Sequence, residues 1–214
     1  METVLAIDTA GHACSVALVC ATSEIKFSKT CWMARGHAGV LASLTQAALD
    51  TLGPHQVSAI AVIRGPGGFT GMRAGLAYAR AYGLARGIPT YGFDTFTALR
   101  LSVGSQTPCL IDSRRGDYFY DLTTAQILDL PKPIDGSIGI LPASHLINHS
   151  QPLAGSIWQA APEALLTQAK PKAPGWIEPD PIALAHAALA QYQNGILPDR
   201  AALSPLYVRQ PSLR

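Results

Sequence analysis

The chain carries the run Arg64-Gly65-Pro66-Gly67-Gly68-Phe69-Thr70-Gly71-Met72-Arg73 between an apolar segment at 59–63 and an alanine-rich segment. The apolar segment predicts a strand, and the alanine-rich segment predicts a helix. Glycines between a strand and a helix let the backbone approach an anion, and the start of the helix offers free N–H groups. The run has neither the Lys-Ser/Thr end of a P-loop nor the spacing G-x-G-x-x-G. A phosphate site and a tight turn without a ligand are therefore both open.

The composition is that of a globular protein. Of the 214 residues, 48% are hydrophobic and 14% are charged, which excludes a disordered chain. The net charge is +2 without a tract of lysine or arginine, so unaided binding to nucleic acid is not expected. No apolar run reaches about 18 residues, and the first residues lack the pattern of a signal peptide, so we expect a cytoplasmic protein without membrane contact. No C-x-x-C pair is present, which favours buried thiols over zinc or a disulfide for Cys14, Cys20, Cys31 and Cys109.

Two β-hairpins are predicted, each with an aspartate at the end of its first strand. Residues 3–8 end in Asp8, and strand character resumes at 15–19 after a turn. Residues 109–112 end in Asp112 and precede a second strand of their own. This repetition indicates a duplicated α/β unit.

Two helices are predicted between the hairpins, at 35–52 and 71–86. The first has apolar residues at helical spacing, and the second has a small residue at every fourth position. Glycine inside a helix costs about 1 kcal/mol relative to alanine, so close approach of another backbone should offset the cost of Gly75 and Gly83. That backbone can belong to the chain's own sheet or to a second helix, intramolecular or from a partner. As a partner interface we predict Val40, Leu41, Leu44 and Ala48 of the first helix and Gly71, Met72, Gly75, Ala79 and Gly83 of the second.

The second half is predicted to end in a helix and an extended tail. Asp180-Pro181 has the composition of an N-cap followed by a first-turn proline, and Asn194-Gly195 ends the helix. The tail is predicted to dock on the body through Leu206 and Tyr207. We predict an N-terminal lobe at residues 1–105 and a C-terminal lobe, with this helix and tail, at residues 106–214.

Four parts of the chain resemble the TsaB (YeaZ) family, bacterial proteins of tRNA threonylcarbamoyladenosine biosynthesis. They are residues 4–9 with 15–18, residues 65–73, residues 110–115 and residues 205–209. The resemblance covers the first 122 residues and the tail. The chain departs from the family at Gly68, where serine is usual, and at Ala74, where a bulky aliphatic residue is usual. Any contact from that serine hydroxyl is therefore lost.

The resemblance implies an α/β fold of the actin-like ATPase (ASKHA) class, with two RNase H-like lobes of which the second is reduced. It implies a non-catalytic scaffold or activator subunit of the tRNA threonylcarbamoyladenosine (t6A) modification complex. The implied partners are a TsaD-like catalytic subunit, a TsaE-like ATPase, tRNA through the complex, and a second copy of the chain when it is alone. No cofactor is expected to bind tightly, and ATP with magnesium is a candidate only for the assembled complex. An independent ATPase or phosphotransferase of the same fold is the alternative.

The resemblance also bears on catalysis. In the catalytic relative, two histidines four residues apart bind a metal, and their places fall near Thr95 and Leu99, which carry no imidazole. We therefore expect neither a catalytic residue nor a bound metal, and metal analysis would test the remaining hypothesis of a metal-dependent transferase. For His145 and His149, which are four residues apart, surface or loop positions are favoured over metal binding. For His12 and His37, hydrogen-bonding or exposed roles are favoured over catalysis.

Two roles remain open for the two hairpin aspartates, Asp8 and Asp112. In actin-like ATPases, aspartates at such hairpins orient a metal or its water, whereas an aspartate that ends a strand also caps turns. The candidate nucleotide- or phosphate-binding residues are Asp8, Thr9, Gly65, Gly67, Gly68, Thr70 and Asp112.

Overall fold

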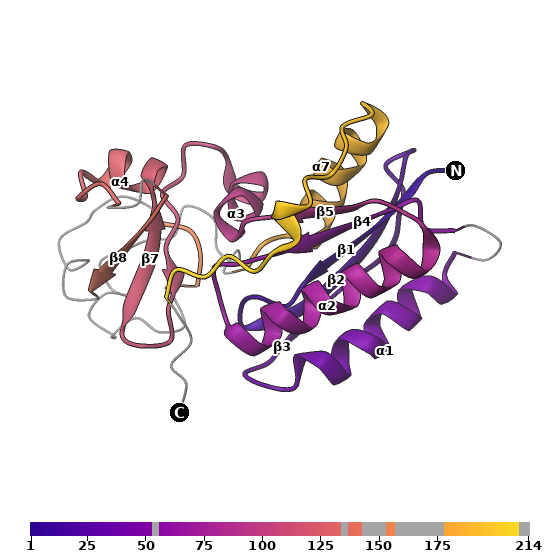
Figure 1. Ribbon diagram of the computed structural model, residues 1–214, viewed down its shortest axis with the longest axis horizontal. Helices are drawn as coiled ribbons and strands as arrows, with labels where there is room; N and C mark the ends of the chain where they lie inside the picture. The colour runs from indigo at the N-terminus through magenta and orange to yellow at the C-terminus, as the bar shows by residue number, and fades with distance from the viewer. Residues whose placement is uncertain (53–55, 134–136, 143–152, 157–177, 210–214) are drawn as a thin grey trace.

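Two β-sheets, each with its own helices, form two lobes that lie side by side (Figure 1). The computed structural model describes residues 1–52, 56–133, 137–142, 153–156 and 178–209. The larger lobe holds a five-stranded sheet with helices on both faces, and the smaller lobe holds a three-stranded sheet.

The larger sheet is mixed and has the strand order β3-β2-β1-β4-β5. Its strands are β1 (Thr3–Asp8), β2 (Ala13–Cys20), β3 (Ile25–Trp32), β4 (Ala59–Ile63) and β5 (Thr90–Phe93). Strand β1 pairs antiparallel with β2 and parallel with β4, and β4 pairs parallel with β5. Every residue of β1, β2 and β4 is buried, because helices cover both faces of the sheet. The first predicted hairpin and the predicted strand at 59–63 are confirmed.

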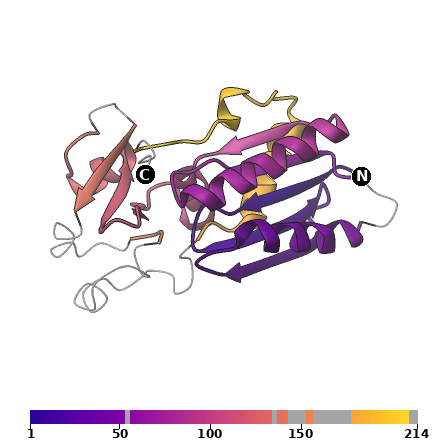
Figure 2. The same cartoon turned by 60° about the horizontal axis from the view of Figure 1, so that its bottom comes forward.

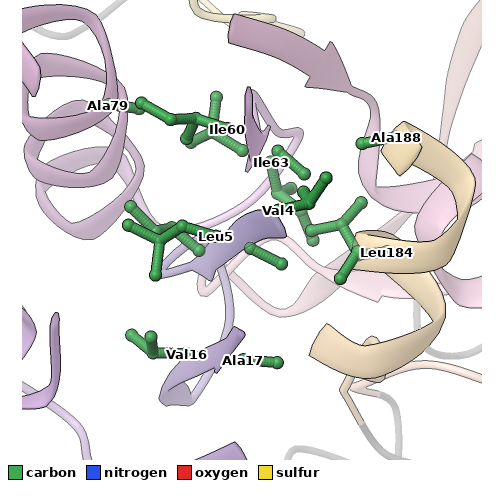
Figure 3. Packing of buried hydrophobic residues seen from close by; sticks show 14 of the residues in the cluster. Val4, Leu5, Val16, Ala17, Ile60, Ile63, Ala79, Leu184 and Ala188 are labelled. Atoms are coloured by element: carbon green, nitrogen blue, oxygen red, sulfur yellow. The ribbon is translucent and has the colours of Figure 1, made fainter. Parts of the chain in front are cut away.

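Helices α1 (His37–Asp50) and α2 (Phe69–Arg86) lie on one face of this sheet, and α7 (Pro181–Gln193) lies on the other. Figure 3 shows Ala79 of α2 on one side of the β1 and β4 side chains and Leu184 and Ala188 of α7 on the opposite side. The sequence predicted all three helices, and the Asp180 side chain caps α7 by accepting from the backbone N–H of Ile182, 2.9 Å away.

The position of α7 differs from its predicted place in the C-terminal lobe. Its apolar face covers the side of the larger sheet that α1 and α2 leave open, so this helix completes the core of the first lobe. The physical reason is that a sheet with apolar residues on both faces needs cover on both. The lobe boundary near residue 105 stays a prediction.

The row of small residues on α2 faces the chain's own sheet. A Cβ on Gly71 would lie 2.1 Å from the carbonyl oxygen of Thr9, and one on Gly75 would lie 2.3 Å from the Thr9 hydroxyl. A Cβ on Gly83 would lie 2.3 Å from the hydroxyl of Thr90. Contact with β1 and β5 therefore offsets the helix-propensity cost of these glycines, which is the intramolecular alternative.

This contact corrects the residues predicted for a partner interface. Buried within the chain are Leu41, Leu44, Ala48, Gly71, Met72, Gly75, Ala79 and Gly83, while Val40 is half-buried against the same core. Helical spacing distinguished the inner face of each helix correctly, but that face packs on the sheet and not on another molecule.

The smaller lobe has the strand order β6-β7-β8. Its elements are β6 (Ile111–Asp112), β7 (Asp117–Asp121), β8 (Ile138–Pro142) and α4 (Leu122–Leu128). Strands β6 and β7 form the second predicted hairpin, which is confirmed. Helix α3 (Thr95–Val103) leads from the larger lobe, and its Phe96 and Leu99 pack with Ile111 and Phe119 of the smaller one. Also formed, but not predicted, are β3, β5, β8, α3, α4 and the short 3-10 helix η2 (Ala201–Leu203).

Candidate functional site

The turn after β1 and the glycine-rich run before α2 lie against each other. The backbone N–H of Gly68 donates to the carbonyl of Ala10 at 2.6 Å, and the Thr9 hydroxyl donates to the carbonyl of Gly71 at 2.8 Å. A Cβ on Gly67 would lie 2.4 Å from the Ala10 carbonyl oxygen. The structure thus brings together three predicted site residues, Thr9, Gly67 and Gly68. Part of the glycine requirement comes from this packing rather than from a ligand.

Asp8 ends β1 and is almost fully buried. Its Oδ1 accepts from the backbone N–H of Ala10 at 2.8 Å, and its Oδ2 has no hydrogen-bond partner within the described ranges. Burial raises the pKa of Asp8 to about 7, although the Ala10 hydrogen bond opposes the shift. The carboxyl group therefore titrates near neutral pH, and one of its oxygens is left for a proton or a ligand.

Asp112 occupies the same place in the second hairpin. Its Oδ1 accepts from the backbone N–H of Arg114 at 2.7 Å, and its Oδ2 lies 3.4 Å from Nε2 of His12 in the first hairpin. Burial would raise the pKa of Asp112, but the contacts with His12 and with the N–H of Arg114 outweigh it and hold that pKa below its ordinary value. Both aspartates thus cap their turns, and Asp112 is held as an anion.

Glu178 joins this group from a distant part of the chain. Its Oε1 accepts from the backbone N–H of His12 at 2.7 Å, and a Cβ on Gly11 would lie 1.7 Å from its Oε2. Burial, followed by the charge of Asp8, raises the pKa of Glu178 to about 8. Sequence reasoning missed this residue, because a single glutamate beside prolines gives no local signal of burial.

A pocket of about 410 Å³ lies where α1 and α2 begin. Its lining includes Thr9, Arg35, His37, Gly68, Thr70 and Arg114. Neither helix has a side-chain cap, so their first N–H groups add positive potential to that of the two arginines. This arrangement can bind an anion. It includes three of the predicted phosphate-site residues, but not Asp8, Gly65, Gly67 or Asp112.

His37 is buried beside this pocket rather than exposed. It is 7% exposed, and its Nε2 has no hydrogen-bond partner among the residues with described positions. Burial lowers the pKa of His37, and the nearby charge of Arg114 lowers it further. The imidazole therefore favours its neutral form, and its buried Nε2 lacks a hydrogen-bond partner among the described residues. The hydrogen bond between His37 and the backbone of Gly11 agrees with the predicted hydrogen-bonding role, whereas the burial of His37 was not predicted.

Thr95 and Leu99, the positions where the family resemblance led us to look for metal-binding histidines, have structural roles. The Thr95 hydroxyl donates to the carbonyl of Pro66 at 2.7 Å, and Leu99 is buried. His145 and His149 lie outside the described residues. Across the described ranges, no three His, Cys, Asp or Glu side chains gather in a way that could hold a metal ion.

Two further features are the burial of the cysteines and the character of the helices. Cys14, Cys20 and Cys109 are buried free thiols, as predicted, and Cys31 is half-buried. Within the part of the chain that the structure describes, no helix has the length and apolar character needed to span a membrane.

Comparison with known proteins gives related sequences for about half of the chain. Residues 32–138 match the family described as TsaD, tRNA N6-adenosine threonylcarbamoyltransferase. An uncharacterised protein of Mycobacterium tuberculosis is 38% identical over 126 residues, which are 56% of this chain and 58% of that protein. The tRNA threonylcarbamoyladenosine biosynthesis protein TsaB of Escherichia coli is 32% identical over 124 residues, which are 55% of this chain and 53% of TsaB. The chain thus spans somewhat more than half the length of these relatives.

Solved structures match over nearly the whole chain. YeaZ from Pseudomonas aeruginosa superposes with a TM-score of 0.70 at 23% identity, covering 97% of this chain and all of YeaZ. A second Pseudomonas aeruginosa structure, titled as similar to peptidase YeaZ, gives a TM-score of 0.71 at 24% identity, with 98% and 100% coverage. These matches confirm the predicted fold of two RNase H-like lobes in the actin-like class.

Proposed function

The chain belongs to the TsaD (tRNA N6-adenosine threonylcarbamoyltransferase) family and is related to TsaB and YeaZ proteins. From that premise we propose that it is a non-catalytic scaffold subunit in t6A biosynthesis. The proposal that the chain is non-catalytic rests on the structural roles of Thr95 and Leu99. Thr95 is committed to the Pro66 carbonyl and Leu99 to the core, so neither place offers a metal ligand. Its partners in this proposal are a TsaD-like catalytic subunit and a TsaE-like ATPase, with tRNA bound by the complex.

The outer face of the α1–α2 pair supports a partner surface. Ala77, Ala81 and Ala85 recur every fourth residue of α2 and are exposed, and the neighbouring helix α1 exposes Ala42 and Ala47. The alanines let another helix approach closely, and the exposed Leu84 and Arg80 among them offer an apolar and a charged contact. This surface replaces the buried residues of the original prediction, and it serves equally for a homologous subunit or for a second copy of this chain.

Substitution on this outer face tests the partner surface. We expect Ala77→Arg and Ala81→Arg to leave the monomer folded and to weaken binding of the TsaD-like subunit at least tenfold, measured by titration calorimetry. Ala190→Arg is the matched control, because Ala190 is an exposed alanine on α7. Wild-type affinity in both α2 variants would exclude this surface.

Reconstitution tests the role itself. The TsaD-like and TsaE-like proteins of the same organism are supplied with tRNA, threonine, bicarbonate and ATP and with the enzyme that makes threonylcarbamoyl-adenylate. We expect t6A, measured by mass spectrometry of digested tRNA, only when this chain is added. Equal t6A formation without the chain would contradict the scaffold proposal.

An anion pocket at the starts of α1 and α2 gives ATP a candidate position in the assembled complex. Thr9, Gly68 and Thr70 line it together with two arginines, which is the chemistry that holds phosphate. The experiment is a comparison of ATP affinity between the complex with the wild-type chain and the complex with Arg114→Gln. A lower affinity supports this position, and an unchanged affinity rejects it.

One observation favours the alternative of an independent ATPase or phosphotransferase. Asp8 keeps an oxygen without a protein partner at the end of β1, where a metal-bound water would be oriented. ATP turnover by the isolated chain that is lost in Asp8→Asn would support this alternative. No turnover above a buffer blank would remove it.

A further inference from the structure

The C-terminal strap, residues 204–209, runs from the larger lobe to the smaller one. It leaves η2 beside β5 and reaches the smaller lobe, as both Figure 1 and Figure 2 show. Its residues are exposed or half-buried, so the strap lies on the surface and is not part of a core.

The first half of the strap is attached to the larger lobe. The backbone N–H of Leu206 donates to the carbonyl of Arg64 at 2.8 Å. The Tyr207 ring stacks on Phe69 with centroids 4.6 Å apart and planes 7° apart. Arg73 donates from Nε to the Tyr207 hydroxyl at 2.7 Å, and its guanidinium lies 4.4 Å from the Phe69 ring centroid. Leu206 is therefore held at the end of β4, and Tyr207 at the start of α2.

The second half of the strap is attached to the smaller lobe. Val208 packs against the cluster that contains Ile111 and Phe119. Arg209 forms an ion pair with Asp117, at the start of β7, and the Arg209 side chain is 30% exposed. The ion pair belongs to the β6–β7 hairpin, and the cluster around Val208 also contains Phe96 and Leu99 of α3, the helix that leads from the larger lobe.

The chain between the two sets of contacts is short. Tyr207 is held by one lobe and Arg209 by the other, and two residues of extended chain span at most about 7 Å. The space that remains among the strap, the glycine-rich turn and the β6–β7 hairpin is about 60 Å³, whereas ligand pockets measure about 300–1,000 Å³. The strap therefore packs closely between the glycine-rich turn and the β6–β7 hairpin, and movement of the hairpin away from the turn would strain or break one of its attachments.

We propose that the C-terminal strap sets the angle between the two lobes, and that its release is the step that lets the smaller lobe move. This inference is independent of the proposed scaffold role, since it concerns the isolated chain. Other connections between the lobes are made by His12 with Asp112, by Arg114, whose Nη2 donates to the Gly11 carbonyl at 2.8 Å, and by α3, which packs on the smaller lobe and pairs Arg100 with Asp121. With the strap released, the smaller lobe would pivot about these connections.

Amide hydrogen exchange of the full chain tests the proposal. Tyr207→Ala removes the ring stack and the Arg73 hydrogen bond, and we expect exchange to rise at least fivefold both in the strap and in residues 111–121 of the smaller lobe. Exchange in β1 and β4 should stay as in the wild type, which shows that the larger lobe is folded. Leu197→Ala is the control, because Leu197 is 87% exposed between α7 and η2. Faster exchange confined to residues 204–209 would overturn the proposal.

Arg209→Gln tests the other end. It removes the ion pair on a partly exposed side chain, so it also serves if Tyr207→Ala fails to fold. We expect faster exchange at 111–121 and also at 204–207. Combining the two substitutions should give no more exchange at 111–121 than the stronger single variant, because either one disconnects the lobes. Independent, multiplying effects would show that the strap does not act as one link, and would refute the inference.

Discussion

The two hairpins have the same local design and opposite electrostatics. In each, an aspartate ends the first strand and accepts a hydrogen bond from the backbone N–H two residues later, at Ala10 and at Arg114. The pKa of Asp8 is nevertheless raised to about 7 and the pKa of Asp112 is lowered. The difference lies in the neighbours, because His12 and Arg114 face Asp112 whereas Asp8 is desolvated and faces Glu178. A repeated sequence motif thus fixes a turn but not the charge state of its aspartate.

The largest expected effect is the dependence of stability on pH. Asp8 binds its proton more tightly when folded, so between about pH 4 and pH 7 the folded state holds more protons and the free energy of unfolding falls as the pH rises. A shift from 3.8 to about 7 corresponds to about 4 kcal/mol. We expect Asp8→Asn to remove at least half of this fall, measured by urea denaturation from pH 4 to pH 8. The remainder belongs to Glu178, whose pKa is raised in the same direction.

An Asp8→Asn variant whose stability depends on pH as that of the wild type does would contradict the proposed difference between Asp8 and Asp112. It would mean that Asp8 is ionised in the folded protein, as Asp112 is. Asn is a matched replacement, since its side-chain oxygen can still accept the Ala10 hydrogen bond.

The second effect compares one glycine beside each hairpin turn. Gly67→Ala would place a Cβ 2.4 Å from the backbone of the first hairpin, and we expect a loss of about 3 kcal/mol in the free energy of unfolding. Gly116→Ala in the second hairpin meets no atom within 4 Å, and only its positive φ of 83° is unfavourable, so we expect about 1 kcal/mol. Equal losses, measured by urea denaturation at one pH, would show that the first turn is no more tightly packed than the second.

The smallest effect concerns the ionised aspartate. Because the pKa of Asp112 is lowered on folding, its contribution to stability is present above about pH 4 and is lost as the pH falls through its folded pKa. We expect Asp112→Asn to cost about 1 kcal/mol at pH 7 and less at pH 3. The sign of this pH dependence is opposite to that of Asp8. The same cost at both pH values would show that only the neutral turn hydrogen bond matters.

Much of the fold followed from local pattern. The two hairpins, the strand at 59–63 and the helices α1, α2 and α7 were predicted, and α7 was predicted with its Asp180 cap. What covers a helix was not predictable. The small residues of α2 identified a closely packed face, but helical period is the same whether a sheet or a partner lies against it. Gly75 meets Thr9, which lies 66 positions earlier and gives no local sign of the contact.

The candidate site was predicted only in part, for the same reason. Thr9, Gly67 and Gly68 were identified from glycine spacing and family resemblance, and they do come together. The sequence did not predict the burial of Glu178 or of His37, because that burial depends on segments far away in the chain.

The sequence by itself determined the turns, the helix ends and the apolar faces, since these depend on residues within a few positions of one another. It also carried the family resemblance, which rests on ordered short motifs. The tertiary structure alone decided that α7 covers the first sheet, that one hairpin aspartate is held as an anion while the other titrates near neutral pH, and that the strap joins the lobes. Burial, desolvation and charge pairing depend on which distant segments meet, and local pattern carries no record of that.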